Sequence, residues 1–420
     1  MNAVVQGGGR TLQPADAGEP WCDRAADDLP FDVTSPSFLA DPYPHYERMR
    51  EQWGQMCRLP SGGVVVLGYR ECSAALRSRD FGHGARTTSD TTAYGLPARS
   101  FLLVDPPVHD QHRSRVAPGF SAEAIGALMP LMTEVLHERV SAFRPGDVCD
   151  VVTDVAEPLA WSVISALLRV PEEFRQDAER LLGGANPRQS GDESLNALAR
   201  VKFSRALRKT LAAASPGRCP TDLISLFTSP WGPDGLPATQ QEALATSGLI
   251  LSAGYKTSVG LIANGMRALL DHPDQLRLLT ESEPTPEDIS KAVEEVARFD
   301  PAIQIGLRAA LTDTEIAGMA IPKGTPLLLL LLLGAANRDP HVFDHPQRLD
   351  VTRTPRHLAF GAGKHFCLGA QLARVQARKA LTVLLQARPQ PAGAAEYDPR
   401  WVTRHLRSLP VRLSPNPEIA

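Results

Sequence analysis

The ten residues Phe360-Gly361-Ala362-Gly363-Lys364-His365-Phe366-Cys367-Leu368-Gly369 form a glycine-rich loop that contains one cysteine. The loop leads directly into an apolar segment, residues 368–386, whose spacing predicts a helix. Glycine lets a backbone turn tightly and approach a flat, bulky group. A cysteine thiolate that faces nearby backbone N–H groups has the properties of an axial haem ligand. A lone cysteine is also commonly a small buried core residue, so the rest of the chain has to decide between these interpretations.

The composition is that of a globular protein with a large core. Of the 420 residues, 43% are hydrophobic and 22% are charged, and the length alone would allow two or three domains. The net charge of −3 does not favour nucleic acid or an anionic membrane as a general partner. The six cysteines lack the spacing of a disulfide framework or a zinc site, which favours a reducing, cytoplasmic compartment.

Two segments bear on membrane insertion. Residues 1–29 are expected to form a flexible tail, because they are polar, rich in Gly, Ala and Asp, and have no apolar run after a basic stretch. Residues 327–333 are seven leucines in succession, far fewer than the roughly 20 residues that a membrane helix needs. A proline and a glycine flank this run, which predicts an element buried on both faces. We therefore expect no membrane-spanning segment.

Helices are expected to dominate the fold, with small β-sheets beside them. Residues 239–270 predict the longest helix, which opens with a capping-box pattern at Thr239–Glu242 and ends before Pro273. At about 1.5 Å per residue this helix would be more than about 40 Å long. A second helix is expected to begin with Pro286 at its first position and to stop before Pro301. Short strands are expected near residues 57–68, 303–333 and 400–413.

An acidic and a basic residue share one face of this second helix. Glu295 and Arg298 are three residues apart, so they can form an ion pair, although such pairs are common and weak evidence alone. This pair and the cysteine loop together resemble two motifs of the cytochrome P450 family. In that family a second arginine joins the pair, and Arg348 falls at its position in the matching region, residues 337–350. The resemblance implies a buried charge network that braces the haem.

The resemblance also implies a haem b cofactor (iron protoporphyrin IX) with Cys367 as the metal ligand. The cysteine loop would contribute further haem contacts from Phe360, Gly361 and Gly369. The two propionates need cationic partners, since charge-assisted hydrogen bonds to carboxylates are stronger than neutral ones. The residues in family register for this role are His109, Arg113, Arg308 and His365.

A segment of the long helix resembles the oxygen-activation segment of the family. Residues 251–258 read Leu-Ser-Ala-Gly-Tyr-Lys-Thr-Ser, and the implied catalytic residues are Ala253, Gly254, Lys256 and Thr257. Gly254 would let the helix pass close over the haem and leave room for dioxygen. The Thr257 hydroxyl can bond a carbonyl one turn back, which loosens the helix locally, and would then donate a hydrogen bond to the activated dioxygen.

Lys256 stands where the family usually has an acid. Two interpretations follow from this departure. In the first, the lysine points to solvent or to a nearby acid, and water serves the proton relay through Thr257. In the second, proton supply is altered, which would favour radical coupling, ring closure or desaturation.

The resemblance covers about residues 30–413 and implies one haem domain, residues 30–420, with the haem held between two helices. The implied reaction partners are dioxygen, a small organic substrate, and a separate ferredoxin with its reductase, which would dock near Arg113 and Lys364. We expect a cytoplasmic monomer that binds no nucleic acid. Substrate would contact residues 82–100, 249–256, 302–306 and 403–406. Within the last of these, Arg404 and His405 suggest a polar or peptide-like natural-product intermediate.

Several functions remain open from the sequence. A monooxygenase is favoured, and an oxidase that couples or cyclises its substrate without oxygen insertion is the alternative. A peroxygenase is disfavoured by the retention of Thr257, and a non-catalytic haem-fold module by the retention of the cysteine loop. A cysteine hydrolase would need a base motif that does not accompany Cys367.

Overall fold

The computed structural model describes residues 29–30, 32–60, 62–84, 100–170, 174, 193–213, 222–232, 235–325, 330–399 and 402–414. Residues 1–28 of the predicted tail lie outside these ranges. So do residues 85–99 of the segment expected to contact substrate, and three leucines of the run at 327–333.

Helices form most of the described chain. In chain order the α-helices are α2 (Pro36–Ala40), α3 (Tyr43–Trp53), α4 (Tyr69–Arg77), α5 (Val108–Val116), α6 (Ala122–Ser141), α7 (Glu157–Leu168), α9 (Glu193–Ala213), α10 (Leu223–Thr228), α11 (Gln240–Asp271), α12 (Pro273–Leu278), α13 (Pro286–Phe299), α14 (Leu333–Ala336) and α15 (Ala370–Gln386). Short helical turns are η2 (Ala117–Phe120), η3 (Val151–Ala156) and η5 (Gly363–His365). The expected mainly helical class is confirmed.

The strands are short and form small sheets, as the sequence predicted. One sheet has the order β1-β2-β9-β5, and another has the order β10-β13-β4. Two-stranded sheets pair β3 with β6, β7 with β8, and β11 with β12. The strands are β1 (Met56–Arg58), β2 (Val64–Val66), β3 (Phe81–Gly82), β4 (Val148–Asp150), β5 (Ile305–Gly306), β6 (Ala309–Ala310), β7 (Thr314–Ile316), β8 (Met319–Ile321), β9 (Leu330–Leu332), β10 (Gln390–Pro391), β11 (Glu396–Tyr397), β12 (Leu406–Ser408) and β13 (Pro410–Arg412).

Capping residues define the two helices that the sequence marked most clearly. At the start of α11 the Thr239 hydroxyl accepts from the Glu242 N–H, and the Glu242 carboxylate accepts from the Thr239 N–H at 2.7 Å. Thr285 and Asp288 form the same reciprocal arrangement at the start of α13. Each box satisfies N–H groups that have no partner inside the helix, which fixes where the helix begins.

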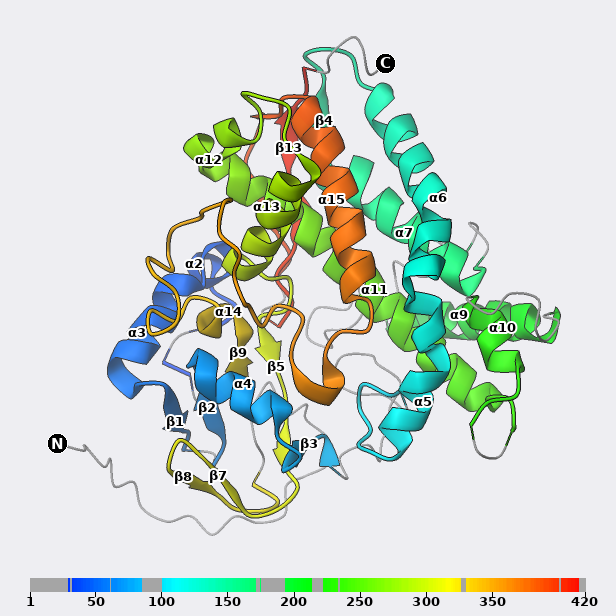
Figure 1. Cartoon of the computed structure of the whole chain (residues 1–420), viewed down its shortest axis with the longest axis vertical. Coiled ribbons are helices and arrows are strands. Elements are labelled where there is room, and N and C mark those ends of the chain that lie inside the picture. Colours follow the sequence, from blue (N-terminus) through cyan, green and yellow to red (C-terminus); the bar gives the residue numbers. More distant parts are fainter. Residues whose placement is uncertain are drawn as a thin grey trace.

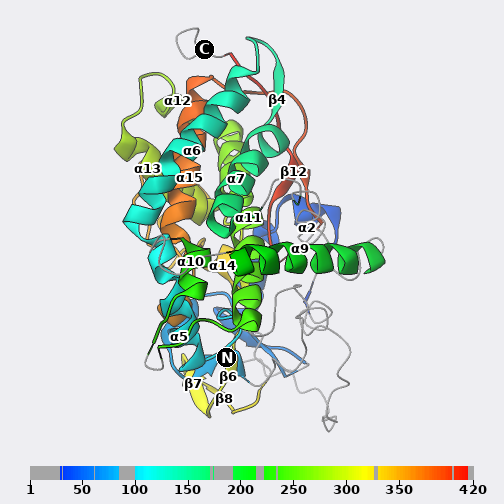
Figure 2. The same ribbon diagram turned by 90° about the vertical axis from the view of Figure 1, so that its right-hand side faces the viewer.

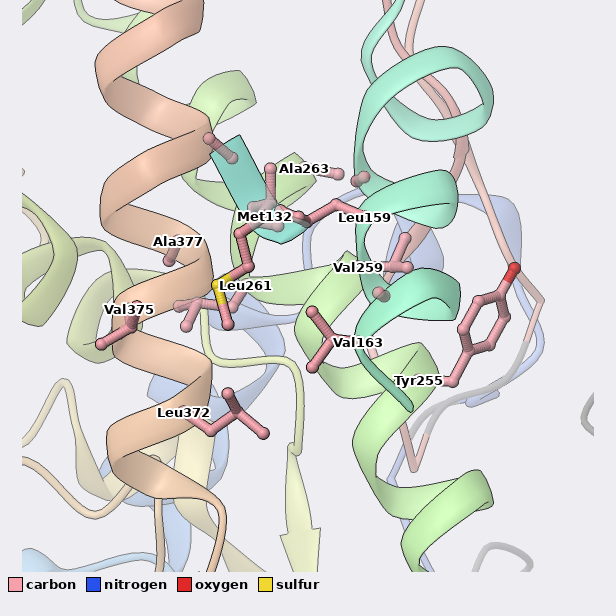
Figure 3. Packing of buried hydrophobic residues seen from close by; sticks show 14 of the residues in the cluster. Met132, Leu159, Val163, Tyr255, Val259, Leu261, Ala263, Leu372, Val375 and Ala377 are labelled. Carbon is pink, nitrogen blue, oxygen red and sulfur yellow. The ribbon is translucent and has the colours of Figure 1, made fainter. Parts of the chain in front are cut away.

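The largest core cluster lies where α11 packs against α7, α13 and α15. Figure 1 shows α15 and α6 side by side with α11 running behind them, and Figure 2 shows α9 lying across the lower part of this bundle. Met132, Val163 and Leu261 point into the space between these helices in Figure 3. Since α11 is apolar on most of its sides, it runs through the centre of the protein rather than along its surface.

Two apolar segments have the length or composition to raise the question of a membrane. The leucine run provides β9, which pairs with β2 on one side and β5 on the other. A second segment, Val151–Leu168, is long and apolar enough to cross a membrane, but most of it is buried inside the protein. It consists of η3 and α7, which pack against α11 and α6, so its apolar character is that of a core helix.

Candidate active site

The cysteine loop is held against α4 by a glycine that no other residue can replace without movement. Gly363 has φ +68°, and a Cβ at this position would lie 2.2 Å from the Leu76 carbonyl oxygen. Gly361 has φ +70°, also in the left-handed region that favours glycine. The Cys367 N–H donates to the Phe360 carbonyl at 2.9 Å, which closes the loop just before α15 begins.

Cys367 is solvent-accessible at the start of α15. The protein mass around the sulfur raises the pKa of the Cys367 thiol, while the Gly369 N–H and the Arg113 guanidinium act to lower it. An N–H group and a positive charge are the partners that a thiolate needs. The loop therefore presents an accessible sulfur whose anionic form has ready stabilisation.

Three imidazole rings gather beside this loop. The His365 ring centroid lies 4.3 Å from that of His109, which comes from α5, and 5.0 Å from that of His83, which follows β3. His109 and His365 are sequence-predicted propionate partners, and the structure brings them together. His83 was missed, because a single histidine between a strand and a loop carries no motif.

His109 is 1% exposed, and one of its ring nitrogens faces a carboxylate. Its Nδ1 lies 2.7 Å from Asp110 Oδ1, and this bond, with one from Lys364, holds the pKa of the Asp110 carboxyl below its usual range. The other ring nitrogen, His109 Nε2, is buried without a hydrogen-bond partner. With Nδ1–H bonded to a carboxylate, Nε2 can donate to a second anion when both ring nitrogens carry a proton.

The predicted arginines lie on either side of this histidine group. Arg308 stands next to β6 and is close enough to lower the pKa of His83 and His365. Burial lowers the pKa of Arg308 itself to about 10, opposed by the nearby Asp105 carboxylate. Arg113, on α5, acts instead on the cysteine. Of the four predicted propionate partners, His109 and Arg308 therefore lie near His365, whereas Arg113 lies near Cys367.

On α11 the threonine behaves as the sequence predicted. The Thr257 hydroxyl donates to the Ala253 carbonyl one turn back at 2.5 Å. Ala253 is exposed and Thr257 partly so, although they lie in the middle of a largely buried helix. Since residues four apart share a helix face, these two line an open side of α11.

Gly254 has a different neighbour from the one expected. A Cβ on Gly254 would lie 2.4 Å from Ile164 Cδ1, so the glycine allows α11 to pack closely on α7. The side of Gly254 that lacks a side chain faces α7, and its role in leaving room for dioxygen stays a prediction. A larger residue at position 254 would therefore disturb the packing of α11 on α7.

Lys256 reaches an acid rather than open solvent. Its Nζ lies 3.1 Å from Glu157 Oε1, at the first residue of α7, and 5.2 Å from the centroid of the Tyr255 ring. The lysine and glutamate side chains are 21% and 19% exposed. This contact agrees with the first interpretation of Lys256, in which the cationic head meets a nearby acid.

The Glu295–Arg298 pair is completely buried, and its third member differs from the expected one. Arg298 donates to both Glu295 oxygens at 2.7 and 2.8 Å, and also to three backbone carbonyls, those of Asn337, Pro346 and Arg348. The Arg348 side chain is exposed and contributes only this carbonyl. The second guanidinium at Glu295 is that of Arg353, at 3.4 Å. The prediction for the Arg348 side chain is therefore corrected, since the chain turns between the two arginines and directs only Arg353 inward.

A second ion-pair group lies next to the first and was also missed. Arg374 on α15 donates to both oxygens of Glu294 at 2.6 and 2.9 Å, and His357 Nε2 lies 3.1 Å from the same carboxylate. The Arg374 guanidinium lies over the Phe360 ring, 4.3 Å from its centroid. This group joins α13 and α15 to the cysteine loop. Glu294 carried no signal of its own beside the recognised Glu295.

Two residues expected near substrate are occupied elsewhere. Arg404 is buried and donates to Asp300 at 2.7 Å and to the Leu39 and Ala40 carbonyls. His405 lies 3.4 Å from Asp398. These contacts serve the fold, so Arg404 and His405 no longer support a polar substrate.

These residues fit a haem. Two carboxylates placed beside His365 would find His109 Nε2 and His83 Nε2, which are buried and lack partners, and the Arg308 guanidinium. An accessible cysteine and an open face of α11 supply the other two requirements, an iron ligand and space above the ring. No group of three or more His, Cys, Asp or Glu residues suited to a bare metal ion occurs in the described ranges.

Comparison with known proteins agrees with this site. Residues 200–387 match the family profile of cytochrome P450. The cytochrome P450 monooxygenase PikC of Streptomyces venezuelae is 34% identical over 421 residues, covering 96% of this chain and 97% of that protein. The crystal structure of P450BioI in complex with hexadec-9Z-enoic acid ligated acyl carrier protein is 31% identical, with TM-score 0.78 and coverage of 90% and 100%. The cytochrome P450 enzyme CxnD, for C–S bond formation in chuangxinmycin biosynthesis, is 28% identical, with TM-score 0.74 and coverage of 90% and 95%.

The chain therefore belongs to the cytochrome P450 family, of the bacterial type. It is an oxidoreductase of the monooxygenase type, and haem and iron come with that family. Family members act on a substrate with dioxygen and draw on redox partners.

Proposed function

We propose that this protein is a haem-thiolate monooxygenase that uses dioxygen to oxidise a small organic intermediate of natural-product biosynthesis. The observation that carries the proposal is the accessible Cys367 sulfur just before α15, beside a group of histidines in which two imidazole nitrogens are buried without partners. Relatives named for roles in natural-product pathways support the substrate class.

Cys367 and the residues around it would hold haem b. Cys367 would ligate the iron, with the Gly369 N–H directed at its sulfur. His109, Arg308 and His365 would bind the propionates, while Arg113 would balance the charge of the thiolate. Phe360 and Gly361 shape the loop that carries the cysteine. A haem bound in this way supplies reductive dioxygen activation to the site.

The residues of α11 would form the opposite wall. Ala253 leaves that wall open, and Thr257 presents a hydroxyl that is already bonded to the Ala253 carbonyl. This hydroxyl can donate its proton elsewhere when that internal bond breaks, or relay a proton through water. Gly254 contributes by letting α11 lie close to α7.

A second candidate function is oxidative coupling or ring closure without net oxygen insertion. The residue type at position 256 favours it, because α11 has a lysine where the family usually has an acid. The likeness to an enzyme named for C–S bond formation supports the same candidate. Peroxygenase activity gains no support from this geometry.

The face behind the cysteine is suited to a separate electron-transfer protein. Phe366 and Val108 are exposed there, at 41% and 42%, and Lys364 adds a cation next to them. A ferredoxin, reduced by its own reductase, has the acidic surface that would complement Lys364 and Arg113. We further propose a cytoplasmic monomer that binds neither nucleic acid nor membrane.

A reduced, carbon-monoxide difference spectrum of the purified protein tests the haem-thiolate assignment. The expected result is the red-shifted Soret band that thiolate ligation produces, and its loss in Cys367→Ser. A protein that binds no haem, or whose spectrum does not change in Cys367→Ser, would refute the assignment. Spin-state shifts across a panel of candidate substrates would then identify the substrate class, and product analysis would separate oxygen insertion from coupling.

A further inference from the structure

His83 occupies a position that β-pairing fixes opposite an arginine. Strand β3 pairs with β6 so that Phe81 faces Ala310 and Gly82 faces Ala309. Continuing this antiparallel register by one residue places His83 opposite Arg308. The two side chains interact electrostatically, since the Arg308 charge acts on the imidazole.

A partly buried carboxylate holds the backbone of His83 in place. Asp105 accepts from the His83 N–H at 2.9 Å and from the Gly84 N–H at 2.8 Å. A Cβ on Gly82 would lie 2.2 Å from Asp105 Oδ1, so this approach requires glycine there. Because its carboxylate is engaged by backbone groups, Asp105 does not pair with the imidazoles.

The imidazole itself lacks a partner. His83 Nε2 is buried without a hydrogen bond, and the ring stands edge-on to that of His365 at 5.0 Å. Burial and the nearby Arg308 lower the pKa of His83 to about 3. A buried polar atom left unpaired is costly, and a cation-rich group of this kind is stabilised by an anion.

We propose that His83 is a further haem-binding residue of this chain, whose Nε2–H donates to a propionate carboxylate beside His109, Arg308 and His365. The inference rests on the haem assignment of the proposed function. It extends the predicted propionate partners by the residue that directly follows β3. His83 Nε2 and His109 Nε2, the two unpartnered imidazole nitrogens that the described residues place beside His365, would then be satisfied by the same ligand.

The test compares holoenzyme variants by haem loss and by vibrational spectroscopy. Haem transfer to excess apomyoglobin gives the release rate, and the propionate bending band in resonance Raman reports hydrogen bonds to the carboxylates. His83→Ala is expected to release haem about tenfold faster, the equivalent of about 1.4 kcal/mol, and to shift the propionate band. His83→Gln, which keeps an N–H donor, is expected to recover most of both changes. His137→Ala, an exposed histidine on α6, is the matched control and should behave as wild type.

The outcomes separate this inference from the proposed function. A wild-type protein without the thiolate carbon-monoxide band would overturn the function itself. A wild-type protein with that band, together with unchanged haem release and an unchanged propionate band in both His83 variants, would overturn only the role of His83. Faster release in His83→Ala and His83→Gln alike, with the band unmoved, would show a structural role and would also overturn it. If His83→Ala does not fold, the propionate band of His83→Gln and of His83→Asn decides.

Discussion

Lys256 Nζ on α11 lies 3.1 Å from Glu157 Oε1 on α7, so the charge that the family usually carries on the long helix has moved to its neighbour. The cation lies on α11 and the acid on α7. Both side chains are about four-fifths buried, so water screens the pair less than it would on an open surface. The pair fixes α11 against the start of α7 within one residue of Thr257.

Replacing Lys256 with Glu tests whether this arrangement sets the chemistry. Two carboxylates would then face each other, and the repulsion should lower stability by about 1 kcal/mol. If Lys256 limits proton supply, the variant should convert more of the consumed electron donor into product, or change the product. We would measure donor consumption, peroxide release and product in parallel. If the fraction of consumed electron donor that is converted into product and the product itself are both unchanged, an altered proton supply is excluded.

A charge-swapped double variant is the control for this experiment. Glu157→Lys combined with Lys256→Glu restores opposite charges at the same distance and should recover the lost stability. If the fraction of consumed electron donor that is converted into product depends only on the residue at position 256, in the single and in the double variant, Lys256 controls proton delivery. If this fraction returns to the wild-type value together with the melting temperature, the ion pair only holds the two helices together.

Arg353 is expected to matter more than Arg348 for the network around Glu295. Arg353→Gln removes a guanidinium 3.4 Å from a fully buried carboxylate and should lower stability by about 1–2 kcal/mol. Arg348→Gln changes an exposed side chain and should stay within about 0.5 kcal/mol of wild type. Thermal unfolding of the holoenzyme, with the fraction of haem-loaded protein, compares the two. The reverse order of effects would contradict the assignment of Arg353.

Gly254→Ala should destabilise the protein through α7. The new methyl group would lie 2.4 Å from Ile164 Cδ1, and overpacking of this kind costs about 1–3 kcal/mol, reduced by the better helix propensity of alanine. Ile164→Val removes that Cδ1 atom, so the double variant should regain stability relative to Gly254→Ala alone. The melting temperatures of wild type, the two single variants and the double variant show whether the two substitutions interact. Additive effects would mean that the methyl group meets something other than Ile164.

Glu294 is expected to contribute a pH-dependent part of the stability. Burial opposes its ionisation, but bonds from His357 and Arg374 outweigh this and lower the pKa of Glu294 from 4.5 to about 2. A carboxyl with a lowered pKa in the folded state stabilises fully above its unfolded value, and this stabilisation disappears as the pH falls through the folded one. The advantage of wild type over Glu294→Gln should therefore be constant above about pH 5 and shrink below 4.5. Urea unfolding of both proteins across this range measures it; a difference that does not change with pH would contradict the prediction.

Much of the fold and the core of the site followed from short-range patterns. Thr239 and Pro286 marked two helix starts, because the capping exchange and the preference of proline for the first helical position are both local. The Thr257 bond to the Ala253 carbonyl followed from a single helical turn. The cysteine loop was recognisable because its glycines, histidine and cysteine are consecutive, and the contacts within it need no information from elsewhere.

The partners of these residues were beyond the sequence wherever a contact joins distant segments. Which arginine meets Glu295 depends on how the chain turns between Arg348 and Arg353. The acid that Lys256 meets is about a hundred positions away, on a helix whose packing is set by Gly254 and Ile164. Arg404 looked available for substrate until the fold buried it against Asp300.

By itself, then, the sequence determined the family and the helix starts and predicted the iron ligand, since each depends on residues that are neighbours in the chain. Only the tertiary structure decided which charges pair, which glycine faces which helix, and that His83 joins His109 and His365. The physical reason is that burial selects partners by distance in space: an ion pair or an unpaired nitrogen acquires its energetic weight only after packing has removed water around it.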